Sequence, residues 1–172
     1  MEITPEIQQK LKLLEQKYSA LGQDLSSYLD GLLHADVTTY WDYIELDTLL
    51  SLQKPKTQFP DEQVFIMYHQ ITELYFKLAL NEFEQLGAQV KIDKDFFLSR
   101  VGRINRYFEA LIQSFEIMVD GMEREQFLKF RMSLLPASGF QSVQYRKIEI
   151  FSSDFINLVA KDKRTKFSAY ST

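Results

Sequence analysis

A histidine and a phenylalanine one helical turn apart are the first residues whose types and spacing could do chemistry. Phe65 and His69 lie in the stretch PDEQVFIMYHQITELYFKLALN, residues 60–81, and residues four apart share one face of a helix. An imidazole in an apolar pocket can accept a hydrogen bond from an N–H group or move a proton. The alternative is a hydrogen-bonded core histidine inside a helical bundle.

A second pair has the same spacing and brings an aromatic ring beside a guanidinium. Phe127 and Arg131 share a face of a short expected helix, and an arginine at the edge of an apolar pocket can bind a carboxylate with two parallel hydrogen bonds. Phenylalanines supply walls for a flat aromatic ligand. With Ser138 and Gly139 in the loop that follows, these residues predict a pocket for an aromatic acid. The alternative is an Arg–Glu bridge on a helix surface.

The helix that must position His69 is the most apolar stretch of the chain. Pro60 suits a first helical position, and the acids Asp61 and Glu62 suit the positive end of the helix dipole. Apolar residues then occur on nearly every side, which is typical of a helix inside a bundle. Gly87 is the expected end of this helix.

The next expected helix begins with Asp93 as its cap and keeps helical spacing to about Val119. Its three arginines, Arg100, Arg103 and Arg106, are interpreted as a solvated or interfacial face and not as a site. Further helices are expected over residues 123–134 and from residue 142 to about residue 159, with a loop over residues 135–139.

Residues 5–33 carry a 3.5-residue repeat over four heptads, which predicts one long helix with a narrow apolar seam. The seam needs a partner helix, either in the same chain or in another subunit, and Gly22 weakens its middle. Residues 37–43 are too irregular for a strand, and residues 46–52 are expected to form a short helix capped by Asp47. We therefore predict an all-α, multi-helix bundle with long antiparallel helices, forming an intertwined oligomer. Its expected organisation is one domain over residues 1–172, comprising a heptad helix (1–36), a pocket segment (37–59) and a helical core (60–160).

Composition excludes several classes of function. The chain has 172 residues, 14 Phe, 9 Tyr and a net charge of −4, which favours a packed core and argues against a nucleic-acid binder. It has no cysteine and two histidines, His34 and His69, so a thiolate nucleophile is excluded and a multi-histidine metal site is hard to build. The polar start and the lack of a long apolar run predict a cytoplasmic protein with no membrane partner.

Three motifs in order carry a family resemblance. TTYWDYIELDTLLSLQ (38–53), PDEQVFIMYHQITELYFKL (60–78) and FLKFRMSLLPASGFQSVQYRKIE (127–149) resemble tryptophan 2,3-dioxygenase, a tetrameric haem enzyme family of tryptophan catabolism by the kynurenine pathway. The resemblance implies that His69 hydrogen-bonds the indole N–H as the distal histidine, and that Phe65 and Phe127 line the indole pocket. It also implies that Arg131 binds the substrate carboxylate, and that Ser138 and Gly139 belong to a loop beside haem and substrate.

Tyr40, Tyr43 and Ile44 match a Tyr-x-x-Tyr-Leu segment that reaches, in the family, into the pocket of a neighbouring subunit. Ile44 replaces the leucine of that segment. The resemblance therefore favours a homotetramer and the intersubunit interpretation of the heptad helix.

In this family, ferrous haem b binds dioxygen, which adds across the indole C2–C3 bond of L-tryptophan to give N-formylkynurenine, while the protein orients the indole. The family's proximal haem ligand is a histidine on a later helix, and no histidine follows His69 here. We thus expect part of a longer enzyme chain, inactive by itself. The alternatives are a naturally short, haem-free module that binds tryptophan or another indole, and a helical assembly subunit.

Overall fold

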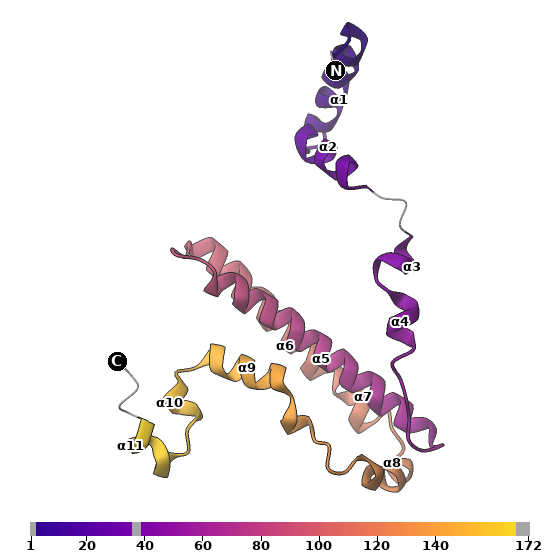
Figure 1. The fold of residues 1–172 in the computed structure, drawn as a ribbon, viewed down its shortest axis with the longest axis vertical. Coiled ribbons are helices and arrows are strands. Elements are labelled where there is room, and N and C mark those ends of the chain that lie inside the picture. The colour runs from indigo at the N-terminus through magenta and orange to yellow at the C-terminus, as the bar shows by residue number, and fades with distance from the viewer. Residues whose placement is uncertain (1–2, 36–38, 168–172) are drawn as a thin grey trace. The chain divides into compact units, whose positions relative to one another are not determined.

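A computed structural model describes residues 3–35 and 39–167, and within these residues every regular element is a helix (Figure 1). The prediction of an all-α fold is confirmed. No helix in these two ranges is both long and apolar enough to cross a membrane. The elements are α1 (Pro5–Ser19), α2 (Leu25–His34), α3 (Tyr40–Tyr43), α4 (Leu46–Leu50), α5 (Pro60–Gly87), α6 (Lys94–Ser114), α7 (Glu116–Val119), α8 (Arg124–Phe130), α9 (Val143–Ser152), α10 (Phe155–Leu158), α11 (Arg164–Phe167) and the 3₁₀ helices Arg131–Leu134, Gly139–Gln141 and Lys161–Lys163.

The contacts of the chain group into two compact units, Met1–Leu50 and Ser51–Thr172, and each unit is described by itself. We call them the amino-terminal unit and the carboxyl-terminal unit. The organisation into one domain over residues 1–172 and the assembly into an oligomer stay predictions.

The amino-terminal unit contains two helices where one long heptad helix was expected, and that expectation was wrong. Gly22 adopts a φ of +68°, which L-residues with side chains rarely adopt, so the chain turns between Ser19 and Leu25. Asp24 then caps α2 by accepting the backbone N–H of Ser27. The apolar repeat did not reveal this turn because Gly22 lies between two apolar heptad positions, so the 3.5-residue spacing continues unbroken across it.

The segment after α2 forms two short helices. Thr39 caps α3 by accepting the backbone N–H of Asp42. Asp47 lies inside the first turn of α4 and does not precede the helix, so its expected capping position was wrong. Val37 lies outside the described residues.

The carboxyl-terminal unit is built around α5, which runs antiparallel to α6 and parallel to α9. The side chain of Tyr68 reaches the end of α6 at Leu111, whereas Glu82 reaches the start of α6 at Arg100, so the two helices run in opposite directions. The pairs Gln144–Glu73 and Phe151–Phe83 show that α9 follows the direction of α5. The antiparallel arrangement of the two long helices is thereby confirmed.

The hydrophobic core lies where α5, α6 and α9 meet. Its buried members are Ala79 and Leu80 on α5, Ile104 on α6 and Ile148 on α9. Small Ala79 lets the helices approach, and the partly buried rings around it complete the cluster: Phe76, Phe83, Tyr107 and Phe108. Apolar burial of this kind is the main force that holds the three helices together.

Two of the three arginines on α6 donate to a carboxylate of the neighbouring helix α5, as the interfacial alternative predicted. The Glu82 carboxylate is 2% exposed and accepts hydrogen bonds from Arg100 at 3.0 Å, Arg103 at 3.4 Å and the Tyr107 hydroxyl at 3.3 Å. Arg106 is exposed. The expected solvated or interfacial face is therefore confirmed, because Arg100 and Arg103 pair across the helix interface with a buried carboxylate that needs opposite charge.

The helix ends show where the spacing arguments succeeded. Gly87 is the last residue of α5, and Asp93 caps α6 through the backbone N–H groups of Asp95 and Phe96, as predicted. The helix expected to reach about residue 159 ends at Ser152, and its continuation is the separate helix α10.

Candidate functional site

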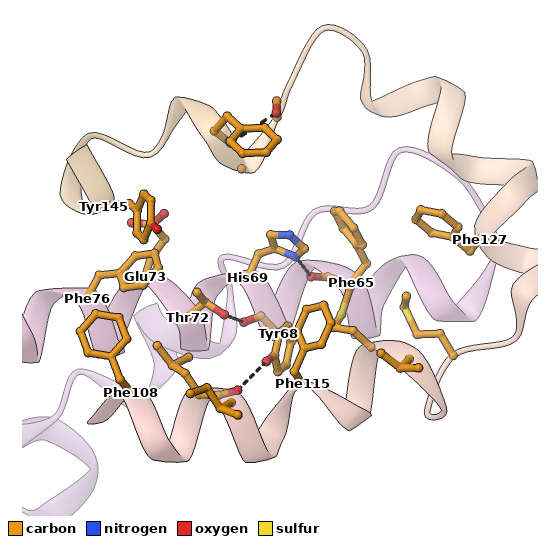
Figure 2. A pocket seen from close by; sticks show the side chains of 18 of the residues that line it. Phe65, Tyr68, His69, Thr72, Glu73, Phe76, Phe108, Phe115, Phe127 and Tyr145 are labelled. Atoms are coloured by element: carbon orange, nitrogen blue, oxygen red, sulfur yellow. Dashed lines mark hydrogen bonds between the residues drawn. The ribbon is translucent and has the colours of Figure 1, made fainter. Parts of the chain in front are cut away.

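A cavity of about 1050 Å³ opens on one side of α5 (Figure 2). Its wall comes from α5, from the end of α6 and α7, from α8, and from the loop and helix that follow residue 137. The lining is mostly aromatic and aliphatic, with few polar groups. The residues that line it are Phe65, Tyr68, His69, Thr72, Glu73, Phe76, Phe108, Leu111, Ile112, Phe115, Met118, Val119, Met122, Arg124, Phe127, Ser138, Gly139, Phe140 and Tyr145.

His69 is held by a hydrogen bond within its own helix. Its Nδ1 lies 2.8 Å from the carbonyl oxygen of Phe65, and a carbonyl can only accept, so Nδ1 donates. In the neutral imidazole, Nε2 is then the acceptor. The side chain is half-buried, and its ring lies 4.1 Å from that of Phe65. One nitrogen is thus used within the helix and the other is left with an acceptor lone pair, and the site role of His69 stays a prediction.

An aromatic cluster joins α8 to α5 beside His69. The ring of Phe130, which is fully buried, contacts Phe65 edge-on at 5.8 Å and Phe127 at 5.5 Å. Phe127 lies 6.3 Å from Phe65, and Figure 2 shows Phe65 beside His69 with Phe127 beyond Phe65. The structure therefore brings together Phe65, His69 and Phe127 as expected, and Phe130 packs against both phenylalanines.

Arg131 is not among the residues that line the cavity. It is exposed, it begins the 3₁₀ helix after α8, and its guanidinium carbon lies 6.0 Å from the centre of the Phe127 ring. The four-residue spacing thus does bring Phe127 and Arg131 together. The role of Arg131 toward a carboxylate stays a prediction. Arg124, which the sequence did not single out, does line the cavity.

Ser138 and Gly139 line the cavity, as their place in the loop suggested. The Ser138 hydroxyl accepts the backbone N–H of Phe140 at 3.3 Å, and the Gln141 side chain accepts the N–H of Ser138 at 3.1 Å. Arg146 of α9 donates to the carbonyl of Phe140 at 3.3 Å. These bonds fix the loop on the start of α9.

Sequence reasoning missed two polar side chains of α5 near His69, Glu73 and Tyr68. Glu73 lines the cavity, and the Gln144 side chain donates to its carbonyl oxygen at 2.9 Å and to its carboxylate at 2.8 Å. Tyr68 donates to the carbonyl of Leu111 at 3.4 Å. The signal that could have found Glu73 is its spacing, because it lies four residues after His69 on the same helix.

Tyr40, Tyr43 and Ile44 belong to the amino-terminal unit. Tyr40 and Tyr43 are exposed, with 75% and 81% of their surface accessible, and Ile44 is half-buried. Their predicted insertion into a neighbouring subunit's pocket stays a prediction.

The residues of the cavity could form the walls of a haem pocket, but they include no second histidine to bind the haem iron. A cavity of this size with aromatic walls suits a large flat group. Haem iron also needs an axial ligand, and His69 is the one histidine between residues 51 and 172. Within residues 3–35 and 39–167, no group of three His, Cys, Asp or Glu side chains could hold a metal ion. If His69 contacts the substrate, the cavity provides no histidine for the iron.

The fold and cavity define an all-α protein whose central helix presents a histidine to an aromatic-lined pocket. Comparison with protein families gives the family: the family model described as tryptophan 2,3-dioxygenase matches residues 31–167. The chain belongs to the tryptophan 2,3-dioxygenase family, and the resemblance seen in the three motifs is confirmed.

Curated relatives agree with this assignment. The chain is 40% identical over 112 residues to the tryptophan 2,3-dioxygenase of Bacillus thuringiensis (strain Al Hakam), which is 64% of this chain and 40% of the relative. It is 38% identical over 116 residues to that of Ruegeria sp. (strain TM1040), 67% of this chain and 41% of the relative. For Shewanella woodyi the identity is 36% over 125 residues, 70% of this chain and 43% of the relative. The chain spans less than half the length of these relatives.

Proposed function

We propose that this chain provides the substrate-binding side of a haem-dependent dioxygenase that opens the indole ring of L-tryptophan to N-formylkynurenine. The observation that carries the proposal is His69, whose Nε2 is left as an acceptor in a cavity walled by Phe65 and Phe127. Membership of the tryptophan 2,3-dioxygenase family supports the choice of substrate.

The bond from Nδ1 to the Phe65 carbonyl prepares His69 for an indole. Because Nδ1 holds the proton, Nε2 accepts the indole N–H and does not repel it. The same bond stops the ring from rotating, so an indole that meets it is held in one orientation, flanked by Phe65 and Phe127. The aromatic rings exclude water from the faces of the ligand.

Binding of the amino-acid end is proposed to fall to Arg131, beside Phe127, through the ligand's carboxylate. Ser138 and Gly139 form the loop beside the bound ligand. Tyr40, Tyr43 and Ile44 are proposed to complete the pocket of a neighbouring subunit in a homotetramer. The cytoplasm is the proposed location.

Haem b and dioxygen are the proposed cofactor and co-substrate, on family membership alone. When bound, haem supplies the oxygen chemistry in enzymes of this kind. His69 is the one histidine among the residues that line the cavity. The contribution of these residues to the reaction is therefore binding and orientation of the indole.

A second candidate is a haem-free module that binds tryptophan or another indole. It is favoured by the same observation, that His69 is the one histidine of the carboxyl-terminal unit and has one ring nitrogen engaged. A third interpretation, a purely structural helical subunit, leaves the aromatic cavity without a use.

The experiment that separates these functions is a pair of titrations of the 172-residue chain, with haem followed by visible absorption and with L-tryptophan followed by calorimetry. Saturable L-tryptophan binding supports the proposed substrate. Absence of a stoichiometric Soret band alongside it favours the haem-free module for the chain alone. A chain that binds neither ligand contradicts both binding functions.

A further inference from the structure

The starts of α5 and α8 are joined by two hydrogen bonds that centre on Asp61. The Asp61 carboxylate accepts the backbone N–H of Glu123 at 2.5 Å, and the backbone N–H of Asp61 donates to the side-chain oxygen of Gln126 at 3.2 Å. The residues that are joined lie more than 60 positions apart in the chain. We call this pair of bonds the Asp61 clamp.

The clamp satisfies groups that each helix leaves open at its start. The first N–H groups of a helix have no partner inside it, and neither Phe59 before α5 nor Glu123 before α8 provides a side-chain cap. Gln126 accepts from the first turn of α5, and Asp61 accepts from the residue that precedes α8. Gln126 in turn donates its amide N–H to the Glu123 carboxylate at 2.9 Å, which leaves its oxygen facing Asp61. Each helix thus supplies the cap of the other.

The clamp lies next to the residues that the proposed function needs. Phe127 directly follows Gln126, and Arg131 follows the end of α8. Phe65 lies one turn after Asp61 on α5. Fixing the start of α8 on the start of α5 therefore fixes where the arm of residues 124–131 presents the Arg131 guanidinium. The Phe127 ring is held separately by its contact with fully buried Phe130.

We propose that Asp61 is a positioning residue that holds the arm of residues 124–131, and so Arg131, in register with the Phe65–His69 wall. The inference rests on the proposed function, because it assigns recognition of the ligand carboxylate to this arm. Asp61 itself does not line the cavity. Its effect on the ligand passes through the position of Arg131.

The neighbouring acid Glu62 binds the segment before α5, so only Asp61 of these two acids accepts a hydrogen bond from the start of α8. Glu62 is 1% exposed and accepts the backbone N–H groups of Lys56 at 2.8 Å and Thr57 at 2.7 Å, together with the Thr57 hydroxyl. It fastens the segment before α5. A separate pair of bonds, from Gln144 to Glu73, fastens α9 to α5 and offers a matched control.

The test compares L-tryptophan with tryptamine, which has the indole and the amine but no carboxylate. Replacing Asp61 by alanine (Asp61→Ala) is expected to weaken L-tryptophan binding about fivefold to tenfold and tryptamine binding less than about twofold. Asp61→Asn keeps a side-chain acceptor for the Glu123 N–H and is expected to restore most of the affinity. Gln144→Ala removes the other pair of bonds and is expected to leave the ratio between the two ligands unchanged.

Equal weakening of both ligands by Asp61→Ala, or no weakening of either, overturns the positioning role. So does a failure of Asp61→Asn to recover the ratio. These outcomes differ from a failure of the proposed function, in which the wild-type chain itself binds no L-tryptophan.

If the wild-type chain binds no L-tryptophan, amide hydrogen exchange still tests whether the Asp61 clamp exists. Faster exchange of the Glu123 N–H in Asp61→Ala, with the Thr57 N–H held by Glu62 unchanged, supports the clamp. Unchanged exchange at Glu123 overturns it.

Discussion

The two halves of α5 pack against the same neighbour, α6, but their polar side chains differ in how fully they are paired. Near the carboxyl end, Glu82 is buried and fully surrounded by Arg100, Arg103 and Tyr107. Nearer the amino end, His69 is half-buried, uses one nitrogen within the helix and faces an open cavity. The first arrangement is closed, and the second has room for a ligand.

The difference shows how a scaffold group is distinguished from a site group on one helix. A buried charge is tolerated when partners match it, and it then contributes to one defined packing. A polar group that is held in place yet keeps an acceptor toward an apolar cavity stabilises the fold little and is suited to bind something else. Glu82 and His69 illustrate these two cases within four helical turns.

The largest expected loss of stability comes from removing Glu82, at the closed end of α5. Glu82→Ala leaves two guanidinium groups facing each other without a carboxylate, and we expect it to lower the free energy of unfolding by about 3–5 kcal/mol. His69→Ala removes one hydrogen bond and is expected to cost about 0.5–1.5 kcal/mol. Urea unfolding followed by circular dichroism measures both. Equal losses for the two variants would contradict the distinction.

Two arginines of α6, one paired with Glu82 and one exposed, allow a second comparison of stability. Arg100→Ala removes a charged hydrogen bond to buried Glu82 and is expected to lower the free energy of unfolding by about 1.5–3 kcal/mol. Arg106 is an exposed arginine of the same helix and serves as the matched control. Arg106→Ala is expected to change stability by no more than about 0.5 kcal/mol. A loss of no more than about 0.5 kcal/mol in Arg100→Ala as well would contradict the role given to Arg100.

At the open end, Arg131→Leu is expected to raise the Kd for L-tryptophan about tenfold, which corresponds to about 1.4 kcal/mol, because the carboxylate loses a charged partner. Its cost in stability should be small, since the side chain is exposed. Calorimetric titration of the variant beside Arg124→Leu tests which guanidinium acts. An unchanged Kd in Arg131→Leu with a raised Kd in Arg124→Leu would transfer the role to Arg124.

The closed end also predicts how stability depends on pH. Burial raises the pKa of the Glu82 carboxyl, but the hydrogen bonds and charges of Arg100 and Arg103 outweigh it and hold the pKa below its ordinary value of about 4.5. The pKa of Glu62 is lowered against the same effect of burial by hydrogen bonds from Thr57 and Lys56.

Because the unfolded chain binds protons at higher pH than the folded chain does, both groups stabilise the fold above about pH 4.5, and this stability is lost as the pH falls below that value. Urea midpoints measured from about pH 7 to about pH 3 should decline most in the acidic range. Glu82→Gln should show a shallower decline than the wild-type chain, and an equally steep one would contradict the assignment.

The sequence predicted those parts of the fold that depend on local chemistry. Gly87 is the last residue of α5, and Asp93 capped α6 because its carboxylate accepts the N–H groups of the backbone next to it. The spacing of Phe65 with His69 and of Phe127 with Arg131 correctly placed each pair together, since a helical turn is a local rule.

What the sequence could not give depends on partners far along the chain. The surroundings of Glu82 come from residues 18 to 25 positions away, so the sequence did not show which charges on α6 pair with it. The clamp at Asp61 and the bond from Gln144 to Glu73 join residues more than 60 positions apart. Gly22 was recognised as a weak point of a helix, but its positive φ is a property of the fold and not of the repeat.

The central claim is that Nε2 of His69 accepts the indole N–H of L-tryptophan. The most direct measurement is the Kd of L-tryptophan and of 1-methyl-L-tryptophan, which has no indole N–H, for the wild-type chain and for His69→Ala. The account predicts that the wild-type chain prefers L-tryptophan by about twofold to tenfold, the value of one hydrogen bond, and that His69→Ala removes this preference. A preference that survives in His69→Ala would contradict the account.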